Sequence, residues 1–201
     1  MAGLTIESQK ADALVWLRPR RCDIRYRLVV LCDSVADVIS AAGGWLFDRG
    51  LAGCEAIVLV TDHTDDRALR IVGARAIELH TPQASEVLGA RPDTLLVAAD
   101  LFRHDLRVRQ GVLEAIDEGL TKVMICGDSW PTEFEGLGTS VQHRLSIAAQ
   151  AFKKEALAAL GASSDLMGLV EPFCAIDLRA SRSEAVSRTA TEKLAVHWRT
   201  A

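Results

Sequence analysis

Short apolar runs alternate with stretches of helical spacing along this chain. Six runs predict β-strands, because each is apolar and bounded by polar or turn residues; they cover residues 28–32, 56–61, 74–79, 94–99, 122–126 and 170–178. Apolar positions that recur with a period of about 3.6 residues predict helices over residues 34–49, 67–72, 82–88, 104–118 and 140–160. Strands that alternate with helices in this way favour right-handed crossovers and a mostly parallel sheet covered by helices on both faces.

The predicted architecture is a single Rossmann-like, doubly wound α/β domain of about six strands. We expect the first strand to be central, with the second and third on one side and the fourth to sixth on the other. Pro172 predicts an edge position for the last strand, because proline has no N–H to donate to a neighbour. The domain spans residues 26–179, after an N-terminal extension (1–25) and before a polar tail or loose helix (180–201).

Four of the strand-like runs end in an aspartate, namely Asp33, Asp62, Asp100 and Asp128. The carboxyl ends of parallel strands meet at one edge of a sheet, and ligands bind there where the strand order reverses. Neighbouring strands are about 4.8 Å apart, so we expect Asp33, Asp62 and Asp100 to lie close together. These three carboxylates are candidate ligands for Mg²⁺ or Mn²⁺.

The same strand ends have a second interpretation as helix starts. Aspartate and serine are favoured N-caps, and Asp33-Ser34 and Asp128-Ser129 both stand where a strand gives way to a helix or turn. A helix N-terminus also binds phosphate through free N–H groups, so these four residues are the candidate contacts to a cofactor. The sequence has no GxGxxG after the first strand and no GxxxxGK[ST], which argues against dinucleotide or P-loop binding.

Three histidines fall near the same predicted edge: His63, His80 and His104. Asp62 and His63 are the candidate catalytic residues, because either one can orient a water beside a bound ion. No HxH or HxxxH spacing supports a histidine metal site, so we interpret the histidines as exposed loop residues.

Several local features predict packing and surface contacts. Gly43-Gly44 inside a helix predicts a close contact or a bend, because glycine is a poor helix former. The adjacent cluster at residues 45–47 suggests a subunit contact, although core packing explains it equally well, so a homo-oligomer is an open alternative. Residues 130–139 predict the longest loop, either an ordinary connection or a lid with Gly136 and Gly138 as pivots. Lys153-Lys154 predicts a charged surface exposed to water.

Composition narrows the function classes. Apolar residues make up 49% of the 201 residues, which suffices for a core, and the net charge of -4 argues against a general nucleic-acid binder. The chain has no apolar run of the ~20 residues that cross a bilayer and no secretory signal pattern, so we expect a cytoplasmic protein. Its cysteines form no CxxC pair, and we interpret all five as free thiols, most of them buried.

Two functional hypotheses follow. The first is a ligand-binding or regulatory domain that uses the carboxyl edge of its sheet to contact a small anionic molecule or a protein partner. The second is a metal-assisted enzyme that acts on a phosphorylated or nucleotide-like substrate, with Asp33 and Asp100 holding the ion. We favour the first, because the sequence contains no complete catalytic set.

Overall fold

The computed structural model describes residues 26–62, 66–127, 130–134, 136–163 and 167–176. The predicted N-terminal extension and polar tail lie outside the described residues, as do the candidates His63, Asp128 and Ser129. Seven strands form one sheet: β1 (Arg27–Ser34), β2 (Glu55–Asp62), β3 (Arg75–Glu78), β4 (Thr94–Ala98), β5 (Lys122–Cys126), β6 (Gly138–Arg144) and β7 (Val170–Ile176). Their order is β3-β2-β1-β4-β5-β7-β6.

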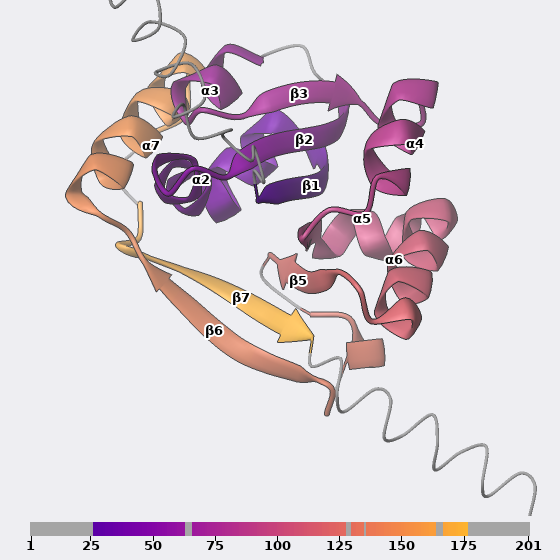
Figure 1. Ribbon diagram of the computed structural model, residues 1–201. Helices are drawn as coiled ribbons and strands as arrows, with labels where there is room; N and C mark the ends of the chain where they lie inside the picture. Colours follow the sequence, from indigo (N-terminus) through magenta and orange to yellow (C-terminus); the bar gives the residue numbers. More distant parts are fainter. Residues whose placement is uncertain (1–25, 63–65, 128–129, 135, 164–166, 177–201) are drawn as a thin grey trace, which may run out of the picture.

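Helices cover both faces of this sheet, as predicted (Figure 1). They are α2 (Val35–Leu51), α3 (Asp66–Ile71), α4 (Pro82–Gly89), α5 (Ala99–His104), α6 (Leu106–Glu118) and α7 (Ile147–Ala159), with a short 3-10 helix, η1, at Thr132–Phe134. Successive side chains of a strand point to opposite faces. Leu28, Val30 and Cys32 of β1 therefore pack with α2, α3 and α7, whereas Val29 and Leu31 pack with α4, α5 and α6.

The predicted strand order is confirmed for the five parallel strands, and β7 follows β5 as expected. Two details differ. β7 is antiparallel to both of its neighbours, and it is not the edge strand, because β6 pairs along its outer side. Pro172 is tolerated in this inner strand because pairing with β5 ends at Phe173, so the missing N–H removes no bond on that side.

The prediction of one helix over residues 140–160 is wrong at its start. Residues 138–144 form the edge strand β6, and α7 begins only at Ile147. Ser146 is the N-cap, since its Oγ accepts a hydrogen bond from the N–H of Ala149 at 3.0 Å. The seven residues of β6 satisfy their backbone groups on β7 instead, and tertiary pairing of this kind overrides local propensity.

The predicted helix over residues 104–118 is α6, which begins two residues later at Leu106, and the short helix α5 before it (Ala99–His104) was not predicted. Asp105 has an extended backbone and caps α6, with its Oδ1 accepting from the N–H groups of Arg107 (2.8 Å) and Val108 (3.0 Å). An aspartate that offers its carboxylate to the backbone stops one helix and starts the next. The break turns the end of α5, and with it His104, toward the strand ends.

The Gly43-Gly44 pair does mark a close contact, as predicted. A Cβ at Gly44 would meet the end of the Leu145 side chain, so any other residue at this helix position would require Leu145 to shift. Of the two alternatives for residues 45–47, core packing is confirmed, because Trp45 and Leu46 are buried in the core and Phe47 stacks on Phe152.

The expectation that Lys153 is solvated is wrong. Its side chain is buried between α2, α7 and β7 and forms an ion pair with Glu171. Only Lys154 of the pair is exposed.

Candidate functional site

The turn after β1 is built by Ser34. Its Oγ accepts from the N–H of Asp37 at 3.2 Å, so Ser34 is the N-cap of α2, and the same hydroxyl donates to Asp37 Oδ2 at 2.6 Å. Of the residues Asp33 and Ser34, only Ser34 therefore caps α2. The carboxylate of Asp33 has a different partner.

Asp33 lies beside His104. The Nε2 atom of His104 is 3.1 Å from Asp33 Oδ1, which joins the end of β1 to the end of α5. Partial burial raises the pKa of Asp33; the His104 ring opposes this increase, and the Asp37 and Asp100 carboxylates add to it. Asp33 is thus a carboxyl group whose charged form is disfavoured by burial and by two other carboxylates.

The three predicted metal ligands occupy one edge but do not converge. Asp62 is the last residue of β2 and is exposed, opposite Ser34 in the strand register. Asp100 lies in the first turn of α5, where its Oδ1 accepts from Arg103 at 2.7 Å and its side chain is 79% exposed. Within the described residues, no three His, Cys, Asp or Glu side chains group as a metal ion would require.

A second histidine–carboxylate pair stands on the same edge. His80 follows β3, and its Nε2 lies 2.8 Å from Oδ2 of Asp105, the residue that caps α6. Burial alone would raise the pKa of Asp105, but the backbone donors of Val108 and Arg107 and the His80 ring together hold that pKa below its usual value. His80 and His104 are both exposed, as predicted; His80 lies in the turn after β3, whereas His104 is the last residue of α5 rather than a loop residue, and each contacts an aspartate.

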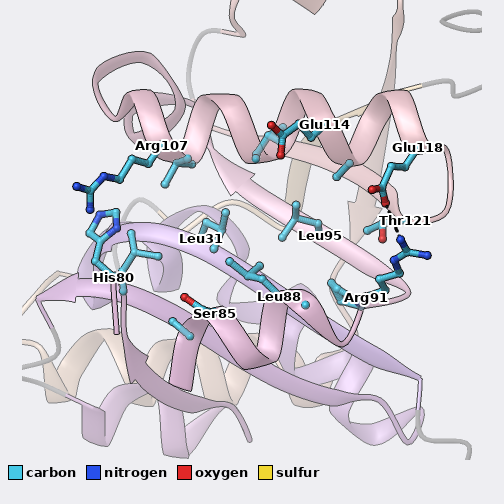
Figure 2. Close-up of a pocket in the computed structure, with 18 residues that line it drawn as sticks. Leu31, His80, Ser85, Leu88, Arg91, Leu95, Arg107, Glu114, Glu118 and Thr121 are labelled. Carbon is cyan, nitrogen blue, oxygen red and sulfur yellow. Dashed lines mark ion pairs between the residues drawn. The ribbon is translucent and has the colours of Figure 1, made fainter. Parts of the chain in front are cut away.

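A groove with a volume of about 470 Å³ runs from His80 between α4 and α6. Figure 2 shows its apolar floor, which Leu31 and Leu95 supply from the sheet and Leu88 from α4. His80 and Arg107 stand together at one end of the groove. At the other end Arg91 and Glu118 form an ion pair of 3.4 Å, with Glu114 beside them on α6.

The groove combines an apolar floor with charged ends, and it is of a size that holds a small organic ligand. Arg107 is exposed and has no ion-pair partner in the described part of the chain, so its guanidinium is available to an anion. Sequence reasoning missed this groove, because its lining comes from four separate elements. One signal in the sequence could have indicated the groove, namely small residues on the two helices that face each other. They are Ala84 and Gly89 on α4 and Gly111 and Ala115 on α6.

The predicted lid is anchored. Phe134 is buried and lies against Phe102, with ring centroids 5.0 Å apart, and Glu133 forms an ion pair with Arg109 at 2.6 Å. Gly138 is part of β6 and therefore does not serve as a pivot. The described part of this segment is an ordinary connection that packs beside α5 and α6.

The cysteines in the described region are free, as predicted. Cys32, Cys126 and Cys174 are buried, whereas Cys54 is partly exposed. Burial raises the pKa of Cys126 to about 12, which keeps its thiol protonated and unreactive. Cys22 lies outside the described residues. No helix in the described ranges is long and apolar enough to span a membrane.

Comparison with known proteins supports the fold. No model of a known protein family matches this chain, and no curated protein matches it. Among solved structures, the A40926 pseudoaglycone deacetylase Dbv21 superposes with a TM-score of 0.55 at 13% identity, covering 76% of this chain and 98% of that chain. The zinc-inhibited form of the teicoplanin deacetylase Orf2 gives 0.52 at 12% identity, covering 75% and 98%. At such low identity the similarity shows the fold alone, a Rossmann-like α/β fold that this chain shares with these deacetylases.

Proposed function

We propose that this protein is a ligand-binding domain whose ligand is a small amphipathic anion held in the groove between α4 and α6. The apolar part of the ligand lies on Leu31, Leu88 and Leu95, and its anionic group contacts Arg107 at the carboxyl edge. The observation that carries the proposal is the groove itself, which has an apolar floor beside Arg107, an arginine without an ion-pair partner among the described residues.

The charge distribution of the groove supports an anion at one end only. Arg107 is unpaired among the described residues, whereas Arg91 is already neutralised by Glu118 at the other end. An apolar surface contributes binding free energy in proportion to the area removed from water, at about 25 cal/mol per Å². A charged hydrogen bond to Arg107 adds about 1.5–3 kcal/mol and fixes the orientation.

A series of alkyl carboxylates tests this proposal by isothermal titration calorimetry, with decanoate as the main probe and decanol as its uncharged control. We expect decanoate to bind more tightly than decanol and Arg107→Gln to remove that difference.

Gly111→Phe is expected to block binding, because a side chain at Gly111 meets no other atom and would project into the groove. Gly50→Phe is the matched control, since Gly50 is also an open helical glycine but lies outside the groove. Unchanged decanoate binding by Gly111→Phe would contradict the proposal.

A second candidate is hydrolysis at the Asp33–His104 pair. Two observations favour it: the pair lies at the strand ends, and the chain shares its fold with deacetylases, one of which is described in a zinc-inhibited form. The described donors do not fit a zinc site, however, because Asp33 and His104 have no third ligand beside them. We therefore rank this candidate second, together with the metal-assisted reaction on a phosphorylated or nucleotide-like substrate.

Thermal melting separates the two candidates. A ligand that binds only the folded state raises the melting temperature. The second candidate requires a shift with Zn²⁺, Mg²⁺ or Mn²⁺ that Asp33→Asn abolishes. The first requires a shift with decanoate that Asp33→Asn leaves unchanged.

A further inference from the structure

His80 has an open ring nitrogen at the end of the groove where Arg107 lies (Figure 2). Its Nε2 atom lies 2.8 Å from Asp105 Oδ2, whereas its Nδ1 atom has no hydrogen-bond partner among the described residues. The backbone of His80 has a φ of 66°, in the left-handed region that glycine adopts most easily. The turn after β3 thus holds an imidazole beside the proposed anion in a conformation that residues with side chains adopt rarely.

Asp105 determines which nitrogen of His80 holds the proton. Burial alone would raise the pKa of Asp105, but the backbone donors of Val108 and Arg107 and the His80 ring hold that pKa below its usual value, so the carboxylate is ionised near neutral pH. An ionised carboxylate only accepts hydrogen bonds, so the hydrogen between the two side chains belongs to Nε2. In a neutral imidazole the other nitrogen is then an acceptor, so neutral His80 presents a lone pair on Nδ1.

A neutral His80 does not match an anionic ligand, because both groups accept hydrogen bonds. In the imidazolium form both nitrogens donate, so Nδ1 can bind the anion while Nε2 keeps its bond to Asp105. The charges lead to the same conclusion. The positive charge of Arg107 and the negative charge of Asp105 cancel when His80 is neutral, and one positive charge remains when His80 is protonated.

We propose that His80 is the second contact to the anion in this groove, and that the ligand binds tightly only when His80 Nδ1 takes up a proton. This inference rests on the ligand site proposed above and adds the residue that determines its specificity for an anion. Arg107 supplies a charge that is constant with pH. His80 supplies one that is not, because histidine changes its charge between about pH 5 and 8.

The other charged residues of this region are arginines, carboxylates and one histidine. They are Asp105, Arg107, Glu114 and Glu118 at the start of α6 and along it, Arg91 after α4, Glu78 at the end of β3, Asp62 at the end of β2 and His104 at the end of α5. Arginine and carboxylate side chains ordinarily keep their charge between about pH 6 and 8.5. His104 contacts Asp33 and does not line the groove, so variants at His80 isolate the effect of one ring.

Isothermal titration calorimetry with decanesulfonate tests the proton uptake, because a sulfonate stays anionic at every pH used. For the unaltered chain we expect the affinity to fall by up to about tenfold per pH unit between pH 6 and 8.5, and the heats in buffers of different ionisation enthalpy to show proton uptake. His80→Asn is expected to bind with the weak, pH-independent affinity of neutral His80. Asparagine tolerates the left-handed backbone and can donate to Asp105, but it takes up no proton. Decanol, the uncharged probe, should bind independently of pH.

Asp105→Asn tests the part of the argument that concerns the position of the proton. Asparagine caps a helix as well as aspartate does, and its amide donates to Nε2, which moves the proton of neutral His80 to Nδ1. We expect Asp105→Asn to bind decanesulfonate more tightly than the unaltered chain at about pH 8.5 and to lose most of the pH dependence. A purely structural role of the His80–Asp105 pair would not produce tighter binding.

His143→Asn is the matched control, since His143 also lies 2.8 Å from an aspartate, Asp48, but is not among the residues that line the groove. This variant is expected to keep the pH dependence of the unaltered chain. An affinity of the unaltered chain that does not change with pH, or an unchanged pH dependence in His80→Asn or Asp105→Asn, would overturn the inference and leave the ligand site in place. A complete lack of decanesulfonate binding at every pH would overturn both.

Discussion

The Nζ atom of Lys153 lies 2.6 Å from Glu171 Oε1 in the buried space between α7, β7 and α2. The carboxylate of Glu171 also accepts from the backbone N–H groups of Gly44 (2.9 Å) and Trp45 (2.7 Å), and Lys153 donates to the carbonyl of Ser40 at 2.6 Å. In a regular helix the N–H of Gly44 would bond to the carbonyl of Ser40. Here Glu171 accepts from the N–H of Gly44 and Lys153 donates to the carbonyl of Ser40, so the ion pair joins α2 to β7 and α7 at Gly43-Gly44.

Glu171→Gln is expected to destabilise the fold by about 3–5 kcal/mol, because it leaves the Lys153 ammonium buried without a counter-charge. Urea unfolding followed by circular dichroism measures the loss as a lower midpoint at unchanged slope. Glu155→Gln is the control, since Glu155 is an exposed residue of α7. An equal effect of the two substitutions would show that the buried pair contributes nothing specific.

Gly44→Ala and Gly43→Ala are expected to act in opposite directions. A Cβ at Gly44 would lie 2.7 Å from Leu145 Cδ1 and nearer still to Cδ2, whereas a Cβ at Gly43 would meet Ile39 at an ordinary 3.4 Å. We expect Gly44→Ala to lower the free energy of unfolding by about 1–3 kcal/mol and Gly43→Ala to leave it unchanged or raise it by up to about 1 kcal/mol. Adding Leu145→Ala should lessen the steric part of the Gly44→Ala effect, which a double-mutant cycle measures.

Acid unfolding should depend on Asp48. Burial alone would raise its pKa, but Ser146 Oγ (2.6 Å) and His143 Nε2 (2.8 Å) hydrogen-bond its carboxylate and hold the pKa below its usual value. A lowered folded-state pKa gives stability that is present above the unfolded pKa and is lost as the pH falls through the folded pKa. We expect stability to decline below about pH 4, near the pKa of an unfolded aspartate.

In Asp48→Asn this part of the acid dependence should be absent, at a cost near neutral pH of about 1.5–3 kcal/mol for the lost charged hydrogen bonds. Asp117→Asn, which alters an exposed carboxyl without an ion pair in the described region, is expected to keep the acid dependence. Thermal melting between pH 2.5 and 7 in ~0.5-unit steps covers the relevant aspartate range. An unaltered acid profile for Asp48→Asn would contradict the assignment.

The pKa of Asp33 should shift in opposite directions when His104 or Asp100 is replaced. Because the His104 ring lowers this pKa and the Asp100 carboxylate raises it, His104→Ala is expected to move it further up and Asp100→Asn to move it down. Titration of the Asp33 carboxyl carbon by NMR measures both shifts. Shifts of the same sign in the two variants would show that His104 does not contact Asp33 in solution.

Much of the fold could be predicted from the local pattern of apolar and polar residues. Apolar runs of strand length separated by helical spacing predicted the parallel part of the sheet, because two buried faces require continuous apolar strands. The doubly wound pattern then supplied the order of these strands. The edge strand β6 was not readable, since its seven residues are mostly polar and exposed and become a strand by pairing with β7. Asp105 was a detectable signal for the start of α6 that the helical period of residues 104–118 concealed.

The sequence by itself determined that Asp33, Asp62 and Asp100 stand at one edge, because parallel strands carry their carboxyl ends together. Only the tertiary structure decided that these carboxylates turn to separate neighbours, with Asp33 beside His104 and Asp100 beside Arg103. It also decided that Lys153 is buried on Glu171 and that a groove opens between α4 and α6. The physical reason is range: strand and helix periodicity is set by neighbours along the chain, whereas charge pairing and cavities depend on side chains that only folding brings together.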